Sequence, residues 1–231
     1  MSGKIDHQVW SQQPKMLAER CRGLALIWTP DVNWFNNDWL GPTPHCHEDA
    51  TEIGYMAQGQ LEIEVGGSKR VYKAGDFIIM PPNKYHNYWF TGDETACFFV
   101  VVGPNHKFRR LKTSDFTPDM HEGDAPYANV FSSDTLPSNE HFKVEKVTLQ
   151  PGESEGEHAV DQRDRVVYIV SGTAQVRLHT FSGPLAANQF VHIPGSTRHE
   201  ISNSGYEPLT YISMIITDPD TVHGTELKED E

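Results

Sequence analysis

The chain has 231 residues, a length that allows one large domain or two small ones. Its net charge of −13 opposes binding to a phosphate backbone, which needs a basic face, so neither nucleic acid nor an anionic membrane surface is an expected partner. The first residues predict no signal peptide, no apolar run is long enough to span a bilayer, and the three cysteines have no paired spacing. We therefore expect a cytoplasmic protein.

The first part of the chain predicts β-structure. Residues 1–20 are polar and without a clear period, so we expect an N-terminal arm. Residues 21–103 consist of short apolar runs separated by glycine-containing turns, which is typical of a β-sandwich or barrel. Within residues 61–65 apolar and polar side chains alternate, the period of a half-buried strand. The predicted strands are 23–28, 52–57, 61–65, 70–73, 77–80, 86–90 and 96–102.

The strand pattern is interrupted once and then returns. Residues 104–128 gain proline, aspartate and charge, which predicts a linker. Alternation begins again at residues 142–149 and strands continue to about residue 216, so we expect a second β domain over 129–218. Residues 219–231 read as a solvated acidic tail. The predicted fold class is all-β, with two domains.

Potential metal ligands cluster in the first domain. His45 and His47 are two residues apart and so lie on the same side of an extended strand, Glu52 opens the next apolar run, and His86 follows a proline-containing turn. Imidazoles and a carboxylate form the ligand set of a divalent transition-metal site, and two histidines with one carboxylate are typical of non-haem iron. A buried glutamate without a cation would also be costly, which favours a metal ion as its partner.

These residues resemble the two sequence motifs of the cupin superfamily. The opening glycine of the first motif has no match, and in the second motif Asn83 and Phe90 replace a glycine and an asparagine. Asn tolerates the left-handed conformation that glycine would supply, so the first replacement is mild. The resemblance implies a double-stranded β-helix, or jelly-roll, barrel and a divalent metal ion. The matching residues are His45, His47, Glu52, Gly59, Gly75, Pro81 and His86.

The second domain repeats the first at a constant offset of 113 residues, as in 172 − 59 for two glycines. The offset has no gaps, which predicts two tandem cupin barrels. Opposite His47, however, stands Val160, and opposite Glu52 stands Arg165. Valine cannot coordinate a metal, and a guanidinium remains charged and would repel a dication. We therefore expect one metal ion per chain, held in the N-terminal barrel.

Two interpretations are open for the altered centre of the second barrel. Arg165 could form an anion site together with His158 and His199. Alternatively, it could form a structural ion pair with an acidic residue close in the sequence. The candidates for that pair are Glu157, Asp161 and Asp164.

Aromatic residues could form a substrate pocket in the first barrel. If His86 points inward, Tyr88 and Phe90 share its strand face, and Trp28 and Trp39 are further candidates. Barrel core is the alternative role for all four side chains. No residue is assigned as a catalytic acid, base or nucleophile.

The resemblance implies several functions, because cupin barrels support many chemistries. Three histidines and one carboxylate on an octahedral metal leave two adjacent positions, which suits an oxygenase. Our leading hypothesis is an Fe(II) dioxygenase acting on a small organic acid or phenol, similar in plan to gentisate and 3-hydroxyanthranilate dioxygenases. One alternative is a redox-neutral lyase, isomerase or decarboxylase that uses Mn, Ni or Zn. Another is a non-enzymatic metal-containing protein that binds a small molecule. Family analogy further suggests a homodimer.

Overall fold

The computed structural model describes residues 5–6, 15–18, 21–28, 45–47, 50–90, 96–103, 108–110, 128–130, 142–179 and 181–216. The chain divides into two compact units. The N-terminal unit comprises Trp10–Ser133, and the C-terminal unit comprises Met1–Val9 with Asp134–Glu231. Every regular element in the described residues is a β-strand, and none of them forms a helix that could cross a membrane. The predicted all-β class is therefore confirmed.

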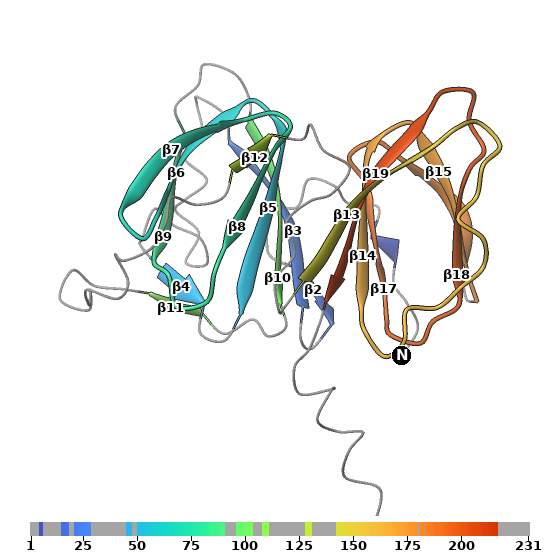
Figure 1. Ribbon diagram of the computed structural model, residues 1–231, viewed down its shortest axis with the longest axis horizontal. Helices are drawn as coiled ribbons and strands as arrows, with labels where there is room; N and C mark the ends of the chain where they lie inside the picture. Colours follow the sequence, from blue (N-terminus) through green and yellow to red (C-terminus); the bar gives the residue numbers. More distant parts are fainter. Residues whose placement is uncertain are drawn as a thin grey trace, which may run out of the picture. The chain divides into compact units, whose positions relative to one another are not determined.

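The N-terminal unit consists of two antiparallel sheets, drawn in blue to green in Figure 1. One has the strand order β12-β8-β5-β10-β3-β2 and the other has the order β11-β4-β9-β6-β7. The strands are β2 (Lys15–Ala18), β3 (Cys21–Trp28), β4 (His45–His47), β5 (Thr51–Gln58), β6 (Gln60–Val65), β7 (Ser68–Lys73), β8 (Asp76–Met80), β9 (His86–Phe90), β10 (Ala96–Gly103), β11 (Phe108–Arg110) and β12 (Ala128–Val130).

Apolar side chains from both sheets of this unit form one core. Ile63 and Val65 of β6 contribute from one sheet, and Phe98 and Val100 of β10 contribute from the other. These residues are at most 6% exposed, as expected for the inward side of alternating strands. The two sheets therefore close over a common interior, which is the barrel that the sequence predicts.

The C-terminal unit is built in the same way, and its strands are yellow to red in Figure 1 apart from the blue β1. A sheet of order β1-β17-β14-β19-β13 and a sheet of order β16-β15-β18 share a core that includes Val167, Val176 and Ile201. The strands are β1 (Ile5–Asp6), β13 (Phe142–Leu149), β14 (Arg165–Ser171), β15 (Thr173–Leu178), β16 (Phe181–Ala186), β17 (Phe190–Ile193), β18 (His199–Asn203) and β19 (Leu209–Ile216).

The offset of 113 residues holds in the backbone as well as in the sequence. Strands β6, β7, β9 and β10 coincide with β15, β16, β18 and β19 when their numbers are shifted by this amount, as in 173 − 60. Three positions with a left-handed backbone also coincide: Asn83 (φ 60°) with Ser196 (φ 62°), Gly59 (φ 69°) with Gly172 (φ 82°), and Gly75 (φ 95°) with Asn188 (φ 65°). The predicted tolerance of Asn83 for this conformation is confirmed.

The ends of the predicted domains take part in the sheets. Within the predicted arm, β2 pairs with β3 of the N-terminal unit, whereas β1 pairs with β17 of the C-terminal unit. Within the predicted linker, β11 pairs with β4, and β12, which begins at its last residue, pairs with β8. The predicted acidic tail, 219–231, lies outside the described residues.

Candidate metal centre

Three side chains from three strands of the N-terminal unit meet at one point. His47 ends β4, Glu52 is the second residue of β5, and His86 begins β9. Their potential ligand atoms all lie within 4.8 Å of one another. Nε2 of His47 is 2.8 Å from Oε2 of Glu52, and Nε2 of His86 is 3.1 Å from the same oxygen. Two imidazoles and one carboxylate are thus brought to a geometry that can hold a metal ion.

The centre is shielded from solvent. His47, Glu52 and His86 are 6%, 2% and 1% exposed. Burial alone would raise the pKa of the Glu52 carboxyl, but the electrostatic attraction and hydrogen bonds of the two histidines hold that pKa well below its usual value. The Glu52 carboxylate is therefore stabilised in its charged form, which is the form that binds a cation.

The backbone fixes these side chains from both sides. Strand β5 is central in its sheet, where Glu52 pairs with Met80 of β8 and with Val102 of β10. The turn before β9 is tied to β4, because the amide of Asn83 donates to the carbonyl of His47 at 2.8 Å. Nδ1 of His86 lies 3.0 Å from the carbonyl of Lys84 and donates to it, which leaves Nε2 directed toward Glu52.

Tyr88 supports the carboxylate from behind. Its hydroxyl donates a hydrogen bond to Oε1 of Glu52, the oxygen that the histidines do not contact. Burial, followed by the charge of Glu52, raises the pKa of Tyr88 well above its usual value, so the hydroxyl remains a donor. The Tyr88 ring packs against Phe98, whose own ring fills the space that a Cβ atom on Gly54 would occupy. The Tyr88 side chain that contacts Oε1 of Glu52 is thus held within the core.

The other predicted residues are described in part. The backbone of His45 pairs with that of His86, so β4 and β9 run side by side at the centre, but the His45 side chain lies outside the described residues. The same holds for the side chains of Trp28 and Phe90, and Trp39 lies outside altogether. Of the four predicted pocket residues, Tyr88 is the one whose side chain is described, and it contacts Glu52. These assignments remain predictions.

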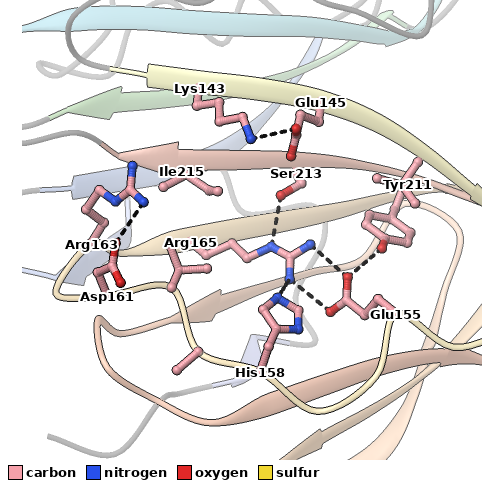
Figure 2. A pocket seen from close by; sticks show the side chains of 13 residues that line it. Lys143, Glu145, Glu155, His158, Asp161, Arg163, Arg165, Tyr211, Ser213 and Ile215 are labelled. Carbon is pink, nitrogen blue, oxygen red and sulfur yellow. Dashed lines mark hydrogen bonds and ion pairs between the residues drawn. The ribbon is translucent and has the colours of Figure 1, made fainter.

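The second barrel contains a different centre, in which Arg165 occupies the middle (Figure 2). Its guanidinium donates to both carboxylate oxygens of Glu155 at 2.9 and 3.0 Å, and its Nε donates to Oγ of Ser213 at 2.9 Å. Its Nη1 also lies 2.8 Å from Nε2 of His199 and 3.4 Å from Nε2 of His158. His158, Arg165 and His199 therefore lie together, as the predicted anion site requires. The positive charge of Arg165 is, however, already balanced by Glu155.

The carboxylate partner of Arg165 differs from all three predicted candidates. Glu157 pairs with Arg198, Asp161 pairs with Arg163, and Asp164 pairs with His192. Glu155 lies in the loop before β14, where no strand period indicates which side chains point inward, so no sequence pattern predicts its role. A further residue that the sequence missed is Tyr211, whose hydroxyl donates to Oε2 of Glu155 at 2.8 Å.

The histidines of this second centre have defined orientations. Nδ1 of His199 donates to the carbonyl of Thr197 at 2.8 Å, and Nδ1 of His158 donates to that of Gly156 at 3.1 Å. Each Nε2 therefore carries the lone pair and accepts from Arg165. The arrangement of His199 repeats that of His86, since Thr197 and Lys84 are also related by the offset of 113 residues, as in 197 − 84.

The buried His199 predicts a dependence of stability on pH. Burial and then the charge of Arg165 lower its pKa, against the opposing effect of the Thr197 carbonyl. In the unfolded chain this histidine gains a proton near its usual pKa of about 6.5, before the folded form does. The unfolding free energy should therefore decrease as the pH falls below that value. Urea unfolding should show a shallower pH dependence for His199→Gln, and equal slopes would contradict this prediction.

Comparison with known proteins gives both a family and a fold. The model of the Cupin domain family matches residues 38–102 and 145–216, one match in each barrel. Among solved structures, salicylate 1,2-dioxygenase of Pseudoaminobacter salicylatoxidans has a TM-score of 0.65 at 12% identity, with 91% of this chain and 72% of that chain covered. Oxalate decarboxylase OxdC of Bacillus subtilis has a TM-score of 0.59 at 14% identity, with 93% and 77% covered. At these identities the likeness concerns the fold.

Proteins related in sequence match a stretch of this chain about as long as one barrel. A putative mannose-1-phosphate guanylyltransferase of Vibrio cholerae is 33% identical over 82 residues, which are 36% of this chain and 18% of the relative. The matched part thus spans less than a fifth of that enzyme. The pectin degradation protein KdgF of Dickeya dadantii is 28% identical over 85 residues, which are 35% of this chain and 73% of KdgF.

Proposed function

Because this chain belongs to the cupin family, we propose that its buried His47–Glu52–His86 centre binds one divalent metal ion and makes the protein a metal-dependent enzyme. The observation that carries the proposal is the convergence of these three donors from three strands. His45, whose backbone pairs with His86, is the proposed fourth ligand.

The donor set fits such an ion chemically. Two neutral imidazoles and one carboxylate suit Fe, Mn, Ni and Zn better than Mg or Ca, which prefer all-oxygen ligands. Burying a carboxylate at 2% exposure is costly, and a bound cation would offset that cost. When bound, the metal would supply open positions for a bidentate substrate and either activate dioxygen or act as a Lewis acid.

The residues around the centre have separate roles in this proposal. Glu52 supplies the negative charge, and Tyr88 fixes the rotamer of its carboxylate through Oε1. The carbonyl of Lys84 fixes the tautomer and the ring plane of His86. The two sheets exclude bulk water from these donors, which strengthens their electrostatic interactions.

The role of Tyr88 predicts a graded loss of affinity. Tyr88→Phe removes the hydroxyl and keeps the ring that packs on Phe98. Loss of such a supporting hydrogen bond should weaken metal binding by about 10- to 100-fold. Competition titration against a chromophoric chelator measures this change. Because the ring packing is retained, Tyr88→Phe should unfold near the wild-type temperature, and an unchanged affinity would contradict the assigned role.

For the reaction, we propose an Fe(II)-dependent dioxygenase acting on a small organic acid or phenol. Support comes from the convergence of two histidines and one carboxylate, a donor set typical of non-haem iron, and the tandem-barrel fold is similar to that of salicylate 1,2-dioxygenase. Oxygen-electrode measurements with Fe(II)-reconstituted protein should detect uptake with at least one member of a panel of phenols, keto acids and sugar acids. His47→Ala is the matched control. Uptake with none of the panel would contradict the proposal.

A redox-neutral reaction with Mn, Ni or Zn is the second candidate. The fold is also similar to that of oxalate decarboxylase, a protein described with Mn(II) centres. The relative KdgF takes part in pectin degradation, and pectin is built of sugar acids, which brings this substrate class into the panel. The Mn-, Ni- or Zn-loaded protein can be incubated with the same panel of compounds without oxygen. Conversion of any of them would favour this candidate over the dioxygenase.

A further inference from the structure

The centre of the second barrel contains the same kinds of donor atoms as the first. Potential ligand atoms of Glu155, His158 and His199 all lie within 4.8 Å of one another, the same condition that the first centre meets. The carboxylate comes from a different place in the chain, because the position equivalent to Glu52 is taken by Arg165. The second barrel has thus kept two imidazoles and a carboxylate together, although the sequence positions differ.

These donor atoms are directed at a cation that is itself a side chain, the guanidinium of Arg165. The Nδ1 atoms of His158 and His199 donate to backbone carbonyls, so their Nε2 lone pairs are directed toward Nη1 of Arg165. Both oxygens of Glu155 bind the same guanidinium. Figure 2 shows His158, Glu155 and Ser213 converging on it. Every described donor that could bind a metal ion here already contacts Arg165.

The other cations near this centre are engaged elsewhere. In Figure 2, Lys143 pairs with Glu145 at 2.7 Å and Arg163 pairs with Asp161 at 3.1 Å. Arg165, at 5% exposure, is the cation among the described lining residues that reaches the histidines. A cavity of about 430 Å³ borders Arg165, Glu155 and His158. A small ion can therefore reach the donors from solvent once the guanidinium is gone.

We propose that Arg165 is a tethered cation that closes a latent divalent-metal site formed by Glu155, His158 and His199. The guanidinium both occupies the space between the donors and repels a dication. Removing it leaves a carboxylate and two imidazoles with their lone pairs directed at one point, which is a ligand set for Co²⁺, Mn²⁺ or Fe²⁺. The latent site is independent of the metal ion proposed for the first barrel.

The test uses the full chain carrying His47→Ala, so that ion binding in the first barrel does not interfere. Co²⁺ is added, unbound ion is removed by gel filtration, and the metal content and visible absorption are measured. Adding Arg165→Ala should raise the Co²⁺ content by about one equivalent per chain, with an absorption band of histidine-bound cobalt. A further His199→Ala should remove that gain. Arg165→Lys, which retains the positive charge, should show no gain.

Each contrary outcome is specific to this inference. Histidine-dependent Co²⁺ binding in the second barrel while Arg165 is intact would show that the guanidinium does not close the site. No gain with Arg165→Ala, or a full gain with Arg165→Lys, would also overturn the proposal. If Arg165→Ala unfolds, recovery of its circular dichroism spectrum on addition of Co²⁺ supports the latent site, and no recovery overturns it. Failure of the first centre to bind metal would leave all of these comparisons unchanged.

Discussion

His47→Ala should abolish most of the metal binding of this protein. Nε2 of His47 lies 2.8 Å from Glu52, and without this imidazole the described ligand cluster loses one of its three donors. We expect the affinity for the metal ion to fall by at least about 100-fold, which is more than the loss expected from removing a supporting hydrogen bond such as that of Tyr88. Isothermal titration and metal analysis of the dialysed protein measure the effect, and reconstituted activity should disappear with the metal.

The matched control for this change is His199→Ala, which removes a buried histidine from the other barrel. Its Nε2 accepts from Arg165 and is not available to a metal ion. Metal content should therefore remain at about one equivalent per chain in this variant. Loss of metal in His199→Ala, or retention of metal in His47→Ala, would contradict the assignment of the metal to the first barrel.

Glu155→Gln should strongly destabilise the C-terminal unit. The Glu155 and Arg165 side chains are 14% and 6% exposed and share two hydrogen bonds, so the substitution leaves a buried guanidinium without its counter-charge. Breaking a buried ion pair from one side costs about 3 kcal/mol or more in unfolding free energy. Thermal and urea unfolding of the full chain should show an early transition that wild-type protein lacks.

Glu157→Gln is the control for this second change, because the residue lies in the same loop and also forms an ion pair. Its partner is Arg198, and their side chains are 58% and 66% exposed. Solvent-exposed pairs of this kind contribute little to stability, so the transition temperature should stay at the wild-type value. If the two glutamine variants unfold alike, burial is not what makes the Glu155 pair important.

The fold is predictable from the sequence because local patterns of alternating and turn residues determine its strands. Alternation over residues 61–65 and 142–149 marks strands that the structure contains as β6 and β13. Turn residues separate the runs, and Asn83 has the left-handed conformation that its place in the turn requires. The constant offset then gave the number of barrels. Local period and internal repetition were therefore sufficient for the architecture.

The residues of the first centre are partly predictable from the sequence for the same reason. His47, Glu52 and His86 lie on strands or directly at their ends, where a period of two residues determines which side chains turn inward. The role of Tyr88 is not predictable from the sequence. Its strand face predicts that the side chain points inward but not that the hydroxyl reaches Glu52. Such a contact depends on the packing of two separate strands.

Pairings between distant segments could not be read from the sequence. Residues 5 and 6 were assigned to an arm, yet β1 pairs with β17 nearly two hundred positions later. Strand β11 fell in the predicted linker because its three residues are too few to show a period. Glu155 was missed because loop residues obey no such period. The two strand pairings are long-range, and Glu155 reaches Arg165 from a loop ten residues earlier, so no local pattern encodes any of these contacts.

The covalent attachment of the Arg165 guanidinium has a consequence for uniformity within a protein sample. A free ion can be withdrawn by a chelator, released by acid or exchanged for a competitor, and molecules that bind one are commonly a mixture of loaded and empty forms. A side chain can do none of these things, so every copy has the same charge at this place from its synthesis onward. Of the two described centres, incomplete loading would therefore affect only the proposed metal centre in the N-terminal barrel.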